Sequence, residues 1–230
     1  MGHDLSIDEQ REDCQPSVVG NDLQDRERTL YESFAKRWFD ILGAIVLLAL
    51  TAPIMAGTAL VVRRSLGRGI VFVQMRVGVH GRPFRIYKFR TMHHDRRKRE
   101  ARLPEGFDRR RATKCVDDPR HTRVGRILRR YSLDELPQLI NVLRGDMSLV
   151  GPRPELHSFA IEHGLVEHVR HETRPGMTGP FQVSALRCGG DLRAGFHLDV
   201  EYVNSITLRN DLKYLARTVA SIARSSTIGS

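Results

Sequence analysis

Residues 41–62 have the sequence ILGAIVLLALTAPIMAGTALVV, and these 22 residues include no charged side chain. A run of this length can cross the hydrocarbon core of a bilayer as a helix. A buried core helix is the alternative interpretation, but an uninterrupted apolar run this long favours a membrane segment. The run therefore predicts that the N-terminal part of the protein attaches it to a membrane.

Basic side chains flank both ends of this apolar run. They are Lys36, Arg37, Arg63, Arg64 and Arg68. Basic residues prefer the cytoplasmic side of a membrane, so both ends favour the same side. Pro53 lies near the middle, where it removes a backbone hydrogen bond. We therefore expect a re-entrant helix–break–helix over residues 36–68, broken at Ala52 and Pro53. A single kinked spanning helix is the alternative.

The net charge of +10 is distributed unevenly along the chain. Residues 1–35 hold nine acidic and three basic side chains, a net of −6, and predict a mobile leader. This leader lacks the apolar stretch of a secretory signal. Residues 82–130 hold eighteen basic and six acidic side chains, a net of +12. Such a surplus favours an anionic partner, namely nucleic acid, a phosphate-bearing substrate or acidic lipid.

Short periodic segments predict the rest of the fold. Residues 70–74 and 83–89 are rich in β-branched and aromatic side chains and predict a small hairpin. Residues 122–130 have helical spacing, and residues 207–223 predict an amphipathic helix that lies on the membrane or faces the core. Residues 69–230 therefore predict a cytoplasmic domain that is mainly α with a small β-hairpin (α+β), with interfacial amphipathic helices.

The segment SLDELPQLINVLRGDMSLVGPRPE, residues 132–155, carries adjacent acidic residues. Ser132 and Glu135 have the spacing of a capping box, so Asp134 and Glu135 would then only begin a helix. Pro137 opposes this interpretation, because a helix that begins nearer to the proline leaves both carboxylates more exposed. The local pattern alone supports a functional and a capping role equally.

Basic side chains close to the acidic pair in sequence favour the functional role. They are Lys88, Arg90, Arg129, Arg130 and Arg153. Two prolines fix the backbone around Arg153, and a guanidinium held in this way suits bidentate phosphate binding. One or two carboxylates with substrate phosphates commonly hold Mg²⁺, and an aspartate can attack phosphorus. These residues predict phosphoryl transfer on an anionic substrate at a membrane face.

Six segments, in this order, resemble the bacterial sugar transferases, which are small monotopic phosphoglycosyl transferases. They are KRWFD (36–40), FVQMRVGVHGRPFRIYKFRTM (72–92), the segment 132–155, RPGMTG (174–179), LDVEYV (198–203) and DLKYLARTV (211–219). Each segment alone is a weak signal. Together, behind an apolar run, they form a specific resemblance over about residues 36–218.

The resemblance implies the reaction and its partners. Enzymes of this family transfer a sugar 1-phosphate from a UDP-sugar to a polyprenyl phosphate, such as undecaprenyl phosphate, and release UMP. It implies Mg²⁺ as the cofactor and the cytoplasmic face of the bacterial inner membrane as the location. Anionic membrane lipid is a further expected partner. A homodimer is possible, and nucleic acid is not an expected partner. The rival interpretation is a membrane-tethered protein that binds nucleic acid or anionic lipid without catalysis.

The resemblance also implies residue roles. Asp134 corresponds to the nucleophile that forms a phosphosugar intermediate, and Glu135 supports acid–base steps. Both carboxylates are expected to hold Mg²⁺. Further residues are expected near the phosphates or the nucleotide, namely Lys88, Arg90, Arg129, Arg153, Arg174 and Asp199.

The chain departs from the family pattern in three places. Ala52 stands where the family often has serine before the proline. Residues 184–196 lack the usual Gly-Arg and Trp pattern, which leaves the sugar open. Residues 96–114 form an unusual basic stretch, which we interpret as a solvated charged loop. None of these departures changes the acidic pair.

Overall fold

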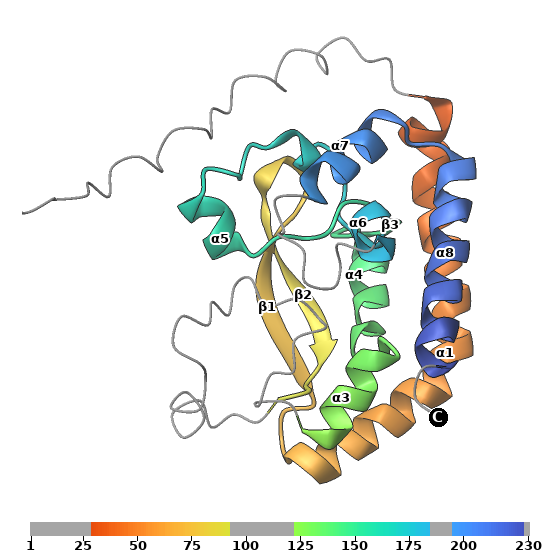
Figure 1. The fold of residues 1–230 in the computed structure, drawn as a ribbon, viewed down its shortest axis with the longest axis vertical. Helices are drawn as coiled ribbons and strands as arrows, with labels where there is room; N and C mark the ends of the chain where they lie inside the picture. The colour runs from red at the N-terminus through yellow and green to blue at the C-terminus, as the bar shows by residue number, and fades with distance from the viewer. Residues whose placement is uncertain (1–28, 93–121, 185–194, 228–230) are drawn as a thin grey trace, which may run out of the picture.

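The computed structural model describes residues 29–92, 122–184 and 195–227. Most of the acidic leader, the basic stretch 96–114 and most of segment 184–196 lie outside the described residues. The elements, in chain order, are η2 (Tyr31–Ala35), α1 (Lys36–Leu66), β1 (Val71–Val77), η3 (Val79–Gly81), β2 (Pro83–Phe89), α3 (Arg123–Arg130), η4 (Leu133–Glu135), α4 (Gln138–Arg144), β3 (Ser148–Val150), α5 (His157–Glu162), η5 (Val169–His171), β4 (Gly176–Thr178), α6 (Pro180–Val183), α7 (Phe196–Asn204) and α8 (Leu208–Thr227). Figure 1 shows the β1–β2 hairpin between α5 and α4. The mainly helical fold with a small antiparallel hairpin is as predicted.

Helix α1 contains the whole apolar run and continues through Pro53. Pro53 has no N–H to donate to the carbonyl of Ala49, and the Thr51 hydroxyl donates to the Leu47 carbonyl at 2.6 Å. Both features bend helices, and Figure 1 shows α1 changing direction along its length. The predicted break at Ala52 and Pro53 is therefore corrected to a bend within one continuous helix.

The surface of α1 is largely exposed. Its most apolar 18-residue window has a mean hydropathy of 2.4, yet only 11% of that window is buried within the protein. Exposed apolar side chains run along it, including Trp38, Leu42, Val46, Leu50 and Ile54. This exposure excludes the buried core helix that the sequence left as an alternative. By length and composition, α1 can cross a membrane.

Two clusters of buried side chains form the core. The larger joins the hairpin to α4, β3 and the end of α7, and contains Ala44, Phe84, Ile86, Leu139, Val142, Met147, Leu149, Val150, Tyr202 and Ile206. The smaller consists of Val62, Phe89 and Leu128 and packs the C-terminal part of α1 against α3. Helix α1 therefore contributes only a narrow stripe to the core, and most of its apolar surface stays outside.

A short parallel pair, β3 and β4, joins two motifs that are distant in sequence. The Gly151 N–H donates to the Thr178 carbonyl at 2.9 Å, and the Gly176 N–H donates to the Pro152 carbonyl at 2.8 Å. A Cβ on Gly151 would lie 2.4 Å from the Arg174 carbonyl oxygen. The GPRP and RPGMTG segments therefore pack backbone against backbone, which requires glycine at this crossing.

A buried ion pair ties the start of α1 to α8. Lys36 Nζ lies 2.6 Å from Asp211 Oδ2 and donates to the Val150 carbonyl at 3.1 Å. The hydroxyl groups of Tyr31 and Tyr202 also donate to Asp211, at 2.7 and 2.6 Å. The Lys36–Asp211 network therefore connects the membrane segment, the C-terminal helix and the strand that precedes the GPRP segment.

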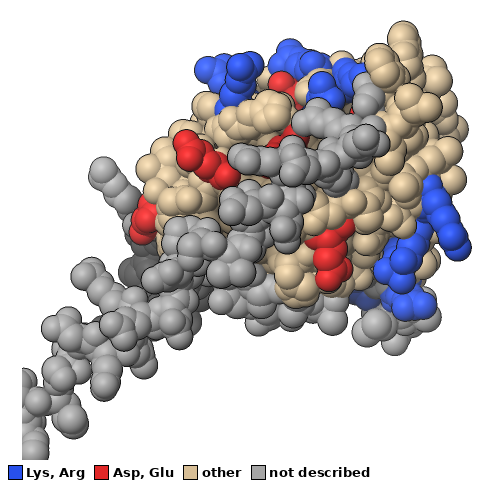
Figure 2. Space-filling view, turned by 90° about the horizontal axis from the view of Figure 1, so that it is seen from above, with Lys and Arg blue, Asp and Glu red and all other residues tan. Residues whose placement is uncertain are grey.

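Helix α8 shares its apolar residues between the core and the surface. Tyr214 and Leu215 pack against the larger core cluster, whereas Leu208, Leu212 and Val219 are exposed. Figure 2 shows that Lys and Arg side chains gather at separate edges of the face seen from above, and that Asp and Glu side chains are scattered over the same face. The core-facing alternative is therefore confirmed for one side of the helix, and the other side remains exposed; contact of that side with a membrane stays a prediction.

Candidate active site

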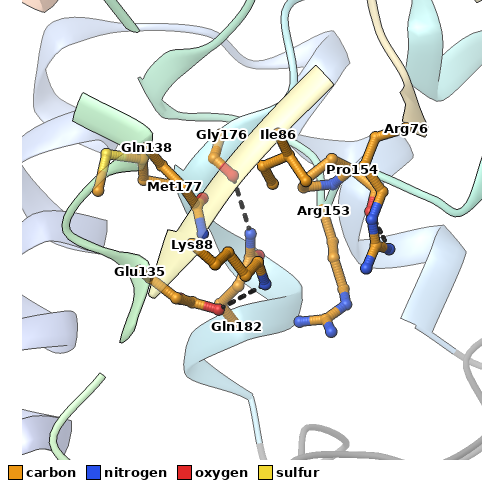
Figure 3. A pocket seen from close by; sticks show the side chains of 10 residues that line it. All are labelled: Arg76, Ile86, Lys88, Glu135, Gln138, Arg153, Pro154, Gly176, Met177 and Gln182. Atoms are coloured by element: carbon orange, nitrogen blue, oxygen red, sulfur yellow. Dashed lines mark hydrogen bonds and ion pairs between the residues drawn. The ribbon is translucent and has the colours of Figure 1, made fainter. Parts of the chain in front are cut away.

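A pocket with an empty volume of about 300 Å³ lies beside the hairpin (Figure 3). Its lining comes from both strands of the hairpin, η4, α4, β4, α6 and the loop after β3. The lining residues are Arg76, Ile86, Lys88, Glu135, Gln138, Arg153, Pro154, Gly176, Met177 and Gln182. Three of these side chains are cationic and one is anionic, so the pocket suits a negatively charged ligand.

The acidic pair lies on the 3₁₀ turn η4, between α3 and α4. Ser132 adopts the left-handed conformation at φ 56° and makes no side-chain capping hydrogen bond. Helix α4 begins directly after Pro137, so the capping-box interpretation is wrong and the later helix start is confirmed. Asp134 is only 4% exposed, whereas Glu135 is partly exposed and lines the pocket. The turn thus presents Glu135 to the pocket and buries Asp134, so the exposure expected for both carboxylates is wrong for Asp134, which is not in the pocket lining.

Lys88 and Glu135 form an ion pair at one end of the pocket. Lys88 Nζ on β2 lies 3.1 Å from Glu135 Oε1, and both side chains remain partly exposed (Figure 3). Partly exposed pairs contribute little to stability. The contact instead places a cation directly beside the acidic turn, where a phosphate oxygen could reach it.

Arg153 is held in place by a buried ionic network behind the pocket. The Arg170 guanidinium donates to Asp199 Oδ2 and to the Arg153 carbonyl, both at 2.6 Å, and to Glu155 Oε2 at 3.4 Å. The Arg153 N–H donates to the same Asp199 oxygen at 3.3 Å. The Arg170 guanidinium also lies 4.3 Å from the centre of the Phe196 ring. This arrangement fixes the backbone that carries Arg153.

Asp199 belongs to this supporting network and does not line the pocket. Burial raises the pKa of its carboxyl to about 6, against the opposing effect of the Arg170 and Arg153 charges. A carboxyl with this pKa is mostly ionised at neutral pH and becomes protonated in mild acid. The ionic contact that supports Arg153 is therefore sensitive to pH.

Three other predicted arginines lie outside the pocket lining. The Arg90 guanidinium donates to the carbonyls of Leu66 and, at 3.5 Å, Gly67, at the C-terminus of α1. Arg174 Nε donates to the Gly145 carbonyl at 2.9 Å, at the end of α4. Arg129 lies in the last turn of α3. Arginine is favourable at helix C-termini because it can bind the unpaired carbonyl groups there. Neither proximity in sequence, for Arg90 and Arg129, nor the family resemblance, for Arg174, is enough to place a side chain in this pocket lining.

Sequence reasoning missed several residues of the site and its support. They are Arg76, Gln138 and Gln182 in the lining, and Glu155 and Arg170 in the network behind it. Arg76 carried a usable signal, because it is a charged residue inside the apolar strand VFVQMRV. The glutamines and Arg170 carried no such signal, since their positions depend on the β3–β4 pairing.

The acidic turn fits the donor chemistry of Mg²⁺. In the part of the chain that the structure describes, no three or more His, Cys, Asp or Glu residues group closely enough to hold a metal ion. Magnesium needs fewer protein ligands, because one or two carboxylates together with substrate phosphates commonly hold it. Asp134 and Glu135 are adjacent on η4, and Glu135 borders a pocket suited to phosphates. These two residues could therefore hold the ion.

A cation-rich pocket beside an acidic turn, in a domain joined to an exposed apolar helix, defines a membrane-associated site for phosphate-bearing molecules. The chain belongs to the bacterial sugar transferase family, whose family model matches residues 31–225.

Characterised and uncharacterised relatives agree with this assignment. The chain is 42% identical over 187 residues to the "Uncharacterized sugar transferase EpsL" of Bacillus subtilis (strain 168), covering 81% of this chain and 86% of that protein. It is 43% identical over 194 residues to the "UDP-glucose:undecaprenyl-phosphate glucose-1-phosphate transferase" of Caulobacter vibrioides, covering 81% and 69%. It is 38% identical over 203 residues to the "Exopolysaccharide production protein ExoY" of Rhizobium meliloti, covering 83% and 86%.

Proposed function

We propose that the protein transfers a sugar 1-phosphate from a UDP-sugar to undecaprenyl phosphate and releases UMP, as a first membrane step of glycoconjugate assembly. The observation that carries this proposal is the surplus of positive charge in a pocket bordered by the Asp134–Glu135 turn. The name of the Caulobacter relative supports both substrate classes. Exposed apolar surface on α1 supports an acceptor that resides in a membrane.

In the first half-reaction, a carboxylate oxygen of Asp134 attacks the phosphorus that bears the sugar. The bond from this phosphorus to the bridging oxygen breaks, and UMP leaves with the electron pair. Lys88 and Arg153 offset charge on the phosphates, and fixed positioning supplies much of the acceleration. The product on the enzyme is an aspartyl phosphosugar.

In the second half-reaction, an oxygen of undecaprenyl phosphate attacks the same phosphorus. The bond to Asp134 breaks, which restores the carboxylate and releases the polyprenyl diphosphate sugar. Glu135 assists the acid–base steps. Mg²⁺ bound at Asp134 and Glu135 would neutralise charge on the phosphate oxygens.

The proposal places α1 as a re-entrant helix, so that the protein is monotopic on the cytoplasmic face of the inner membrane. The bend in α1 and the basic side chains at both of its ends support this topology. Anionic lipid and a second copy of the chain are included as partners. Single cysteines near Arg37 and Arg64 should both be protected from an impermeant reagent in intact cells, and labelling of either one would overturn the re-entrant arrangement.

A screen for UMP release across UDP-sugars, with Mg²⁺ and undecaprenyl phosphate, tests the reaction and identifies the donor. Release should require both substrates in steady state and should cease when EDTA removes the metal ion. Absence of UMP release with every UDP-sugar, from protein that remains folded, would refute the proposed function.

Mass spectrometry tests the covalent step. The enzyme incubated with the UDP-sugar alone should gain the mass of a phosphosugar, on the peptide that contains Asp134. Addition of undecaprenyl phosphate should remove this mass. Persistent absence of the adduct, under conditions in which the complete reaction proceeds, would favour direct transfer between the substrates.

A further inference from the structure

The end of the pocket opposite the Lys88–Glu135 pair holds two guanidinium groups, those of Arg76 and Arg153 (Figure 3). Arg76 Nη1 donates to the Pro154 carbonyl at 3.1 Å, and its Nη2 donates to the Gln74 side-chain oxygen at 2.7 Å. Both acceptors are neutral. Within the described residues, neither arginine forms an ion pair with a carboxylate.

The hydrogen-bonding capacity of Arg76 is also incompletely used. Its Nε is buried and has no hydrogen-bond partner among the described residues. Burial, together with the nearby charge of Arg153, lowers the pKa of the Arg76 guanidinium to about 10, whereas Glu155 and Glu135 act in the opposite direction. Two like charges held together in a partly desolvated site are costly unless an anion joins them.

We propose that Arg76 and Arg153 jointly bind a phosphate group of the bound substrate, and that this group is the phosphate of the departing nucleotide. The assignment rests on the proposed function. Glu135 lines the other end of the pocket, and the buried Asp134, the proposed nucleophile, is its neighbour on η4, so the sugar-bearing phosphorus is attacked at that end. The second phosphate of the diphosphate therefore extends away from the acidic turn, toward the paired arginines.

The test compares ligands that differ only in phosphate. Arg76→Gln removes the charge, and Arg76→Lys keeps a charge without the fork of donors. Arg85→Gln is the matched control, because Arg85 is an exposed residue of the same hairpin outside the pocket. Each protein is measured for inhibition of UMP release by added uridine and by UDP, and for the KM of undecaprenyl phosphate, with circular dichroism to verify folding.

We expect Arg76→Gln to weaken UDP inhibition on the order of tenfold to a hundredfold, as for a lost charge-assisted contact. Inhibition by uridine and the KM of undecaprenyl phosphate should change less than about twofold, Arg76→Lys should be intermediate, and Arg85→Gln should resemble the unmodified protein.

Three results would overturn the proposal. Equal weakening of uridine and UDP would mean that Arg76 only supports the Pro154 backbone. A raised KM for undecaprenyl phosphate with unchanged UDP inhibition would assign the arginines to the lipid phosphate. Unchanged values throughout would remove Arg76 from substrate binding. Failure of the proposed function is distinguishable, since the unmodified protein would then release no UMP.

Discussion

The Lys36–Asp211 network and the pocket are both rich in charged groups, but they differ in how those charges are balanced. Asp211 is fully buried and accepts hydrogen bonds from Lys36, Tyr31 and Tyr202. In the pocket, three cationic side chains face one anionic side chain. Buried charge is tolerable only when it is paired and hydrogen-bonded. The balanced network therefore serves the fold, and the surplus charge in the pocket serves to bind a ligand.

This difference separates two kinds of mutational effect. Substitutions in the balanced network should lower stability and reduce activity only through unfolding. Substitutions around the pocket should lower activity or ligand affinity and leave the fold intact. Stability and activity measured on the same variants therefore test whether the two groups of charges have these separate roles.

The largest effect is expected at the acidic turn. Asp134→Asn removes the nucleophile and should reduce UMP release on the order of 10⁴-fold or more, with little change in the melting temperature. Glu135→Gln should reduce it less severely. The control is Glu201→Gln, an exposed acid on α7. Full activity of Asp134→Asn in a coupled UMP assay would end the nucleophile assignment.

The next effect concerns stability. Lys36→Met leaves Asp211 buried without its cation and should destabilise the fold by about 3–5 kcal/mol. Thermal unfolding in detergent measures this change. Lys213→Met, at an exposed position on α8, should change stability by less than about 0.5 kcal/mol.

The double variant Lys36→Met with Asp211→Asn separates the pair from its surroundings. It should recover part of the loss, because no uncompensated charge then remains buried. If the double variant is as unstable as the sum of the single variants, the two side chains are not coupled. The inference that balanced charge in the Lys36–Asp211 network stabilises the fold would then be wrong.

The sequence predicted those elements that have a clear period. Residues 83–89 form β2 as expected, and the helix predicted over 122–130 is α3, begun by the Thr122 side chain, which accepts from the Gly125 N–H at 2.8 Å. The sequence did not predict strands β3 and β4, because three residues are too few to show a period. Their pairing depends on glycine contacts between segments that are distant in sequence.

The candidate site was predictable only in part for the same reason. Lys88, Glu135 and Arg153 do line one pocket, as their motifs suggested. Arg90 was assigned by charge and proximity and Arg174 by the family resemblance, but each donates to carbonyl groups at a helix end. A one-dimensional pattern records that a charge is present. It does not record whether the charged side chain already donates its hydrogen bonds to a backbone carbonyl.

A smaller loss of activity is expected when the support behind Arg153 is weakened. Asp199→Asn keeps the shape but removes the charge that faces Arg170 and Arg153, with Glu155 nearby. We expect the kcat/KM for the UDP-sugar to fall on the order of tenfold to a hundredfold through misplacement of Arg153. A merely structural role would lower stability without this specific change.

The pH profile distinguishes these roles. The pKa of Asp199 is about 6, so protonation of the unmodified protein below this pH removes the contact and lowers activity. Asp199→Asn should lack this step, while the titration of the substrate phosphates stays common to both proteins. If activity falls in the same way at low pH in both proteins, protonation of Asp199 is not the cause of that fall.

The smallest effect tests a buried neutral group beside the same network. Burial lowers the pKa of His171 to about 3, and the nearby charges of Arg170 and His168 contribute, against a backbone hydrogen bond with Leu165. The unfolded chain takes up a proton near pH 6.5, whereas the folded chain does not. Stability from His171 is therefore complete above pH 6.5 and is lost as the pH falls below it. The loss reaches about 2 kcal/mol at pH 5.

His171→Gln removes this acid sensitivity and retains a polar side chain that can donate to the Leu165 carbonyl. Melting temperatures at pH 7.5 and pH 5 should therefore differ less for the variant than for the unmodified protein. Asp199 acts in the opposite direction between about pH 4 and 6, because its raised pKa favours proton uptake by the folded state. That contribution is common to both proteins, so the difference between them isolates His171. An equal shift in both would mean that His171 is already protonated in the folded state, and the support behind Arg153 would then carry an unbalanced charge of its own.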